Sequence, residues 1–249
     1  MRKYQLPISF IALFCLITSC SRVYQPSSVE FKDYRIKNAA PGSSAVSKLL
    51  QPYADSVNKS MNDVIAVAGM PLEKRQPECT LGNLMADAML AMSKEKYQTH
   101  VDAAFVNYGG IRLTSMAEGN ITRGKIFELS PFDNIVVLLK VNGSLLQEFM
   151  DHIASRGGWP CAGITYQVKD KKAIHILIGG APLKAEHTYT LAVVDYVANG
   201  GDDCTMLQPI PQQNNGYLFR DALIAYLSRQ HSEGKQINVL LENRVSYAK

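Results

Sequence analysis

Residues 103–112 read Ala-Ala-Phe-Val-Asn-Tyr-Gly-Gly-Ile-Arg, a short apolar run that passes directly into a loop with two adjacent glycines. The four apolar residues at its start predict a buried strand. Gly109 and Gly110 would let the backbone come close to a ligand, while Asn107 and Arg112 present polar groups beside it. The loop alone is a weak signal, because it fits neither the GxGxxG fingerprint nor a P-loop, and paired glycines usually mark only a turn.

Helices and strands surround this stretch without a regular βαβ rhythm. Apolar spacing of three and four residues predicts helices at about 44–61, 80–93, 144–155 and 217–230. Apolar or alternating runs predict strands at about 64–68, 103–106, 135–141, 165–169, 173–178 and 189–194. Thr80 is the expected N-cap of the second helix, and Asn142-Gly143 predicts a turn before the third. The mixture predicts an α+β fold rather than a parallel, doubly wound sheet.

The N-terminus reads MRKYQLPISFIALFCLITSC, a basic start followed by an apolar stretch, which is the pattern of a secretory signal. The stretch is too short to span a bilayer comfortably. Residues 17–20, Ile-Thr-Ser-Cys, resemble a bacterial lipobox, in which Cys20 would be acylated; an ordinary cleaved signal with an accidental cysteine is the alternative. We therefore expect a lipoprotein signal peptide at 1–19, a tether at 20–43 and one domain at 44–249. The protein would be exported and held on a membrane by its lipid, facing the periplasm or the cell surface.

Composition and charge fit one globular domain. The 249 residues are 47% hydrophobic and 19% charged, and the net charge of +4 falls to +2 if Arg2 and Lys3 leave with the signal. This balance excludes a nucleic-acid track and a polybasic membrane surface. After export, Cys79, Cys161 and Cys204 would remain, enough for at most one disulfide within the chain. The fold must therefore depend on its apolar core.

The glycine loop is a stronger signal when it is considered together with three other segments of the chain. The four segments are Arg75 before Glu78-Cys-Thr-Leu-Gly-Asn-Leu84, the loop at 107–112, Ser130-Pro-Phe-Asp-Asn134, and Asp195-Tyr-Val-Ala-Asn-Gly-Gly-Asp202. In this order and at these separations, they resemble the C-terminal domain of the 5′-nucleotidase and UDP-sugar hydrolase family. The resemblance covers about Ser44 to Val245. It implies a layered α/β/β/α domain that holds the nucleoside of the substrate.

The resemblance also implies roles for individual residues. Phe132 and Tyr196 match an aromatic pair that sandwiches the base, with tyrosine where phenylalanine is frequent. Asn134 matches a residue that hydrogen-bonds the base edge, and Asp202 matches one that accepts hydrogen bonds from the ribose hydroxyls. Taken singly, each has an ordinary alternative: aromatics beside strand ends pack into cores, and Gly-Gly-Asp is common turn chemistry.

Three more residues match polar positions of the family, and two others depart from its pattern. Arg75 and Arg112 match arginines that reach the ribose and phosphate, although a solvated surface charge is the default for each. Asn107 matches an asparagine at the interface with the catalytic half. Tyr108 and Asp203 stand where glycine is common. Tyr108 would either narrow the pocket or meet the partner, and the backbone after Asp202 would turn differently.

The sequence carries no catalytic apparatus of its own. In the family, a separate domain holds two metal ions and directs water at the phosphate ester. Its DxH, GDxxD and GNHE motifs do not occur here, and neither does GxSxG. The histidines, which stand singly among unrelated neighbours, are His100, His152, His175, His187 and His231. We expect no cofactor in this chain and divalent metals only in a partner.

Three functions remain open at this point. The first is the nucleotide-recognition part of a 5′-nucleotidase that acts with a separately encoded metallophosphatase, with a broad or purine-leaning base preference. The second is a stand-alone lipoprotein that binds nucleosides or nucleotides without catalysis. The third is a relic whose fold has outlived its ligand.

Overall fold

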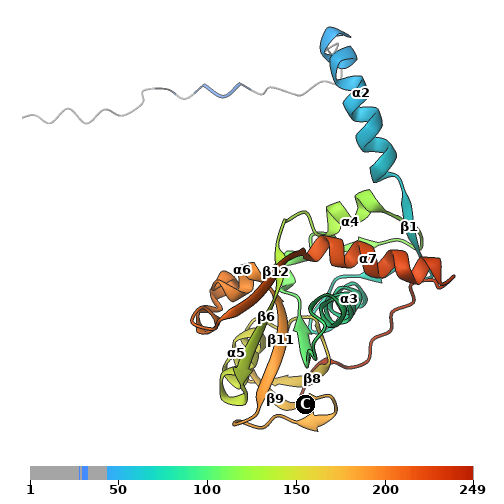
Figure 1. Cartoon of the computed structure of the whole chain (residues 1–249). Coiled ribbons are helices and arrows are strands. Elements are labelled where there is room, and N and C mark those ends of the chain that lie inside the picture. Colours follow the sequence, from blue (N-terminus) through green and yellow to red (C-terminus); the bar gives the residue numbers. More distant parts are fainter. Residues whose placement is uncertain (1–27, 29, 33–43, 249) are drawn as a thin grey trace, which may run out of the picture. The chain divides into compact units, whose positions relative to one another are not determined.

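The structure is a computed structural model that describes residues 28, 30–32 and 44–248 (Figure 1). The predicted signal peptide, Cys20 and most of the tether lie outside the described residues. The chain divides into two units, Met1–Ser47 and Lys48–Lys249, and the four sheets of the described residues belong to the second. Among the described helices, none is both long enough and apolar enough to cross a membrane.

A five-stranded mixed sheet forms the centre of the second unit. Its order is β12 (Gln212–Leu218), β6 (Ile135–Asn142), β11 (Thr188–Val194), β3 (Ala103–Phe105) and β7 (Cys161–Ala162). β11 runs parallel to β3 and antiparallel to β6, with Val193 opposite Val137. The middle strands are nearly continuous apolar runs, as expected for strands covered on both faces. The predicted strands at 135–141 and 189–194 are confirmed, each one residue longer than predicted.

Helices cover both faces of this sheet. α3 (Thr80–Tyr97) and α7 (Phe219–Ser232) pack together on one side, and α5 (Gly143–Ser155) lies on the other (Figure 1). The prediction that Thr80 is the N-cap of α3 is wrong. The helix begins at Thr80, and the N-cap is Cys79, whose Sγ accepts from the Gly82 N–H at 3.3 Å. The helix also continues four residues past its predicted end.

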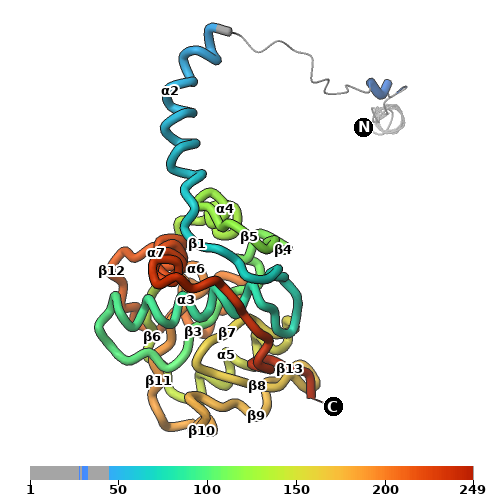
Figure 2. Tube along the Cα trace, turned by 90° about the vertical axis from the view of Figure 1, so that its right-hand side faces the viewer, coloured from blue at the N-terminus to red at the C-terminus, as the bar shows by residue number. Residues whose placement is uncertain are grey.

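A second sheet packs on α5 from the other side. Its order is β10 (Ala181–Pro182), β9 (Lys172–Ile178), β8 (Ile164–Lys169) and β13 (Val245–Tyr247). β13, near the C-terminus, lies beside β8 and runs parallel to it (Figure 2). Because α5 contacts strands of both sheets, it joins them into one core. The α+β class predicted from the sequence is confirmed.

The remaining elements are short or lie at the edges. β1 (Val64–Ala68), a predicted strand that is confirmed, pairs with β5 (Gly119–Thr122), and β2 (Leu72–Glu73) pairs with β4 (Ser115–Met116). Helices α4 (Arg123–Leu129) and α6 (Asp195–Ala198) each follow a strand. The helix predicted from residue 217 begins two residues later, because Tyr217 and Leu218 complete β12.

The helix predicted at about 44–61 is confirmed as α2 (Ser44–Met61), the first helix of the described residues, and it continues through Pro52. Its apolar residues recur on one stripe, as predicted, but they do not join the core. Leu49 and Tyr53 are 69% and 70% exposed.

The three cysteines of the domain are buried and unpaired in the part of the chain that the structure describes. Burial raises the pKa of the Cys161 thiol to about 12, and it has the same effect on Cys204. Both are therefore neutral thiols at physiological pH and act as small apolar side chains. The fold is held by its core rather than by a disulfide among these residues.

Candidate functional site

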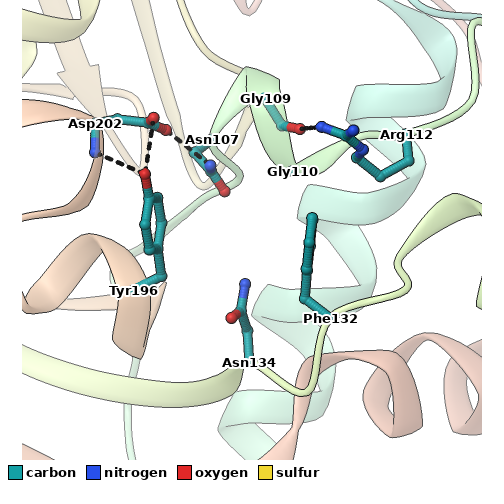
Figure 3. Close-up of a pocket in the computed structure, with 8 residues that line it drawn as sticks. All are labelled: Asn107, Gly109, Gly110, Arg112, Phe132, Asn134, Tyr196 and Asp202. Carbon is teal, nitrogen blue, oxygen red and sulfur yellow. Dashed lines mark hydrogen bonds between the residues drawn. The ribbon is translucent and has the colours of Figure 1, made fainter.

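One pocket collects eight of the nine residues that the sequence analysis assigned to a ligand. It has a volume of about 400 Å³, which is suitable for a small organic ligand. Its lining is Asn107, Gly109, Gly110, Arg112, Phe132, Asn134, Tyr196 and Asp202 (Figure 3). These residues come from three separate segments that follow β3, precede β6 and follow β11. The ninth, Arg75, is exposed and lies outside the lining.

The glycine loop forms one side of the pocket because its backbone turns tightly after β3. Residues Tyr108–Gly110 make a single 3₁₀ turn, closed by the Gly110 N–H donating to the Asn107 carbonyl at 2.9 Å. A Cβ on Gly110 would lie 2.6 Å from the Asn107 Oδ1, so a larger residue would push that side chain away. Gly110 thus keeps the buried Asn107 amide in position for its pocket contact.

Phe132 and Tyr196 form two opposing walls. The two residues are 44% and 47% exposed, and Figure 3 shows their rings on opposite sides of an open space with Asn134 between them at one end. Large aromatic side chains usually bury most of their surface, so two half-exposed rings facing one space suit a flat ligand. The two residues of the expected sandwich thus lie on opposite sides of one space, and a base between them stays a prediction.

Asp195, which was not assigned a role from the sequence, links the segment that carries Tyr196 to the start of β6. Its Oδ1 accepts from the Ile135 N–H at 3.0 Å and from the Tyr196 N–H at 2.9 Å. The carboxylate thus ties the start of α6 to the start of β6. Because one of these amides belongs to Tyr196 and the other follows Asn134 in the chain, Asp195 fixes the backbone of these two lining residues relative to each other.

Arg220, on the first turn of α7, fixes the loop that carries Phe132. This buried guanidinium donates through Nη1 to the carbonyls of Pro131 and Phe132, at 3.2 and 3.3 Å. Its Nη2 donates to the Asp133 Oδ1 at 2.5 Å. Sequence reasoning missed Arg220 because 88 residues separate it from Phe132 and it belongs to none of the four quoted segments.

Asp202 places a carboxylate at the far end of the pocket. Its Oδ2 accepts from the Asn107 Nδ2 at 2.8 Å, and its Oδ1 accepts from the Tyr196 hydroxyl at 3.3 Å. The Asp202 N–H in turn donates to the Tyr196 Oη at 3.2 Å (Figure 3). Three residues that were predicted separately from the sequence are therefore joined in one hydrogen-bond network.

Two cations lie near the glycine loop. The Arg112 guanidinium lies 5.6 Å from the centroid of the Phe132 ring and donates to the Gly109 carbonyl at 3.3 Å. The Lys74 Nζ lies 4.2 Å from the centroid of the Tyr108 ring and donates to the Ile111 carbonyl at 2.8 Å. Burial lowers the pKa of Lys74, and the positive charge of Arg112 lowers it further.

Tyr108 and Asp203, the two residues that depart from the family pattern, differ in their surroundings. Tyr108 does not line the pocket, so the glycine loop accommodates it without narrowing the ligand space. Asp203 adopts a left-handed backbone with φ of 60°, the conformation that a glycine would take without strain. Within the described residues, no group of three His, Cys, Asp or Glu side chains could hold a metal ion.

Comparisons with known proteins show the family of this domain. The model of the family described as "5′-nucleotidase, C-terminal domain" matches residues 56–209. A 5′-nucleotidase of Vibrio cholerae is 29% identical over 195 residues, which cover 74% of this chain and 34% of that protein. An apyrase of Anopheles gambiae is 26% identical, over 85% of this chain and 40% of its own length.

Solved structures of two nucleotidases are similar to this chain. The 5′-nucleotidase precursor of Thermus thermophilus superposes with a TM-score of 0.70 and 27% identity, over 82% of this chain and 43% of that chain. The NAD nucleotidase of Haemophilus influenzae, at 17% identity and a TM-score of 0.62, shares the fold over 83% of this chain and 42% of its own. This chain thus spans about a third to two fifths of the curated relatives described above. The family model covers more than half of the chain, and the chain therefore belongs to the 5′-nucleotidase C-terminal domain family.

Proposed function

We propose that this chain recognises the nucleoside part of a nucleotide for a 5′-nucleotidase-type hydrolase. The observation that carries the proposal is the pair of half-exposed rings, Phe132 and Tyr196, facing one space that ends at the Asp202 carboxylate. A base needs flat apolar surfaces on both faces, and a ribose needs acceptors for its hydroxyls. Both features occur in this one pocket.

The other lining residues fit the remaining parts of such a ligand. The Asn134 carboxamide can donate and accept at the edge of the base. Arg112 is an exposed cation at the pocket rim, where it can meet a phosphate oxygen. Because stacking tolerates any base, the lining favours a broad or purine-leaning preference.

We further propose that hydrolysis belongs to a separately encoded two-metal phosphatase domain that this chain joins. The proposal is supported by the family membership and by the name of the Vibrio cholerae relative, a 5′-nucleotidase. Export and a lipid on Cys20 would place both proteins in one compartment.

The test of the partnership mixes the purified protein with a purified two-metal phosphatase and AMP, and follows phosphate release. We expect a complex in size-exclusion chromatography and faster release than the phosphatase gives alone. The matched control replaces Tyr53, an exposed aromatic on α2 outside the pocket lining, with alanine. A phosphatase that neither binds the chain nor gains activity would overturn the partnership and leave the binding proposal standing.

A second candidate function is nucleoside capture without catalysis. It is favoured by one observation: the two facing rings and the Asp202 carboxylate, which would hold a nucleoside, line one pocket of this chain. Calorimetry on the isolated protein separates the two, because capture requires measurable binding of adenosine or AMP alone. Equal binding of ribose 5-phosphate and AMP would contradict the stacking assignment on which both functions depend.

Replacing Arg112 with glutamine should weaken AMP binding by about tenfold and leave adenosine binding within about twofold of the wild type. A hydrogen bond to a charged group contributes roughly 1.5–3 kcal/mol, and only AMP carries the phosphate. Titration calorimetry with both ligands measures the ratio. Arg75→Gln is the comparison, since Arg75 lies outside the lining and should have the smaller effect. Loss of adenosine and AMP binding by the same factor would show that Arg112 supports the Phe132 ring rather than a phosphate.

A further inference from the structure

Asp202 holds a backbone conformation that an aspartate adopts at a cost. Its φ of 52° and ψ of 34° lie in the left-handed helical region, and the following Asp203 has a φ of 60°. Two successive non-glycine residues in this region are rare because each brings its Cβ close to a carbonyl oxygen. A strained turn of this kind persists only where surrounding contacts over-determine it.

The end of α5 supplies contacts from outside the pocket. The His152 Nε2 lies 2.8 Å from the Asp202 carbonyl oxygen. Because a carbonyl only accepts, this nitrogen must carry the proton. One turn later, Arg156 forms an ion pair with the Asp203 carboxylate. Neither side chain lines the pocket, so their direct contact is with the turn rather than with the ligand space.

Tyr196 holds the same turn from inside the pocket. Its hydroxyl accepts from the Asp202 N–H and donates to the Asp202 Oδ1, which fixes the carboxylate relative to its own backbone. A Cβ on Gly201 would lie 2.5 Å from the Tyr196 ring and from its carbonyl oxygen. The ring therefore rests directly on the Gly201 backbone, and a phenylalanine would preserve this contact without the hydrogen bonds.

The fixed carboxylate retains capacity for a ligand. An ionised carboxylate offers about four acceptor positions. Asn107 and the Tyr196 hydroxyl use one position on each oxygen. Each oxygen therefore keeps about one free position, which is the number that two neighbouring hydroxyls of an intact ribose require.

We propose that His152 and the Tyr196 hydroxyl are positioning groups that hold Asp202 ready for both ribose hydroxyls, and so make the pocket selective for ribonucleosides over dideoxynucleosides. The inference rests on the proposed function and adds sugar selectivity to it. His152 acts through the backbone of Asp202, whereas Tyr196 acts twice, with its ring on the base and its hydroxyl on the carboxylate. Prearranged acceptors improve affinity because less freedom is lost when the ligand binds.

The experiment measures the binding of adenosine and 2′,3′-dideoxyadenosine to the purified protein by titration calorimetry. The wild type should prefer adenosine. Tyr196→Phe and His152→Ala should each weaken adenosine binding by about 3- to 10-fold, the usual effect of losing one net hydrogen bond, and leave dideoxyadenosine unchanged. His152→Gln, whose amide can donate to the same carbonyl, should restore most of the preference.

Matched controls are Tyr217→Phe and His175→Gln, because both residues lie outside the pocket lining. A preference for adenosine that survives both Tyr196→Phe and His152→Ala would overturn the inference alone. Parallel loss of both ligands, with no rescue by glutamine, would overturn it too, because it would indicate general loosening of the pocket. If the wild type binds neither ligand, the proposed function fails and the inference fails with it.

Discussion

Replacing Phe132 with alanine is expected to weaken adenosine binding by about 5- to 150-fold, because one stacked aromatic side chain contributes roughly 1–3 kcal/mol per base. The ring is 44% exposed and faces the pocket, so its removal opens no cavity in the core. Its loss should therefore change the free energy of unfolding by about 0.5 kcal/mol or less, as for surface positions in general. Titration calorimetry and urea unfolding of the same protein measure the two effects.

Adenosine and dideoxyadenosine should lose affinity by the same factor in the Phe132→Ala variant, since both carry the same base. Tyr53→Ala removes an aromatic side chain that is 70% exposed and outside the pocket, and it should change neither quantity. An unchanged adenosine affinity in the Phe132→Ala variant would contradict the stacking of the base between Phe132 and Tyr196, on which the proposed function depends.

The parts of the fold that the sequence predicted well are those whose side chains are buried. The strands at the centre of the larger sheet are continuous apolar runs, and their predicted limits were within one residue. The edge strand β12, Gln-Gln-Asn-Asn-Gly-Tyr-Leu, was missed because its residues are polar and mostly exposed, and backbone pairing with β6 defines it. The start of α7 was misplaced for a related reason, since Leu218 at its N-cap makes no side-chain capping hydrogen bond.

Some residues of the candidate site could likewise be predicted from the sequence, and others could not. Residues that line the pocket could be picked out from short motifs, because each motif contains at least one of the side chains that line it. His152 and Arg220 could not be assigned in this way. They contact the backbone carbonyls of Asp202 and Phe132 from helices that lie near these residues only in the folded chain. Neither contact leaves a local pattern in the sequence. Arg75 is the opposite case: its motif predicts a ligand contact that remains to be tested, and the residue lies outside the lining.

Replacing Phe149 with alanine should lower the free energy of unfolding by about 3–5 kcal/mol, the usual cost of truncating a buried phenylalanine. Phe149 is fully buried on α5 and makes edge contacts with the Phe105 and Trp159 rings, with centroids 5.2 and 6.0 Å apart. For a domain of this size the melting temperature should fall by roughly 6–20 °C. Urea and thermal unfolding measure the change, and a loss below about 1 kcal/mol would show that α5 does not anchor the two sheets.

The Phe149→Ala variant also tests whether the packing of α5 in the core affects ligand binding in the pocket. His152 lies one turn after Phe149 on the same helix and reaches the Asp202 carbonyl, so the packing of α5 on β3 determines where that donor lies. At a temperature where the variant remains folded, relaxation of α5 should weaken adenosine binding more than dideoxyadenosine binding. The Phe132 variant should instead weaken both equally, because it removes contact with the base. Different selectivity patterns in these two variants would separate base recognition, which depends on exposed rings, from sugar recognition, which depends on the buried helix behind the pocket.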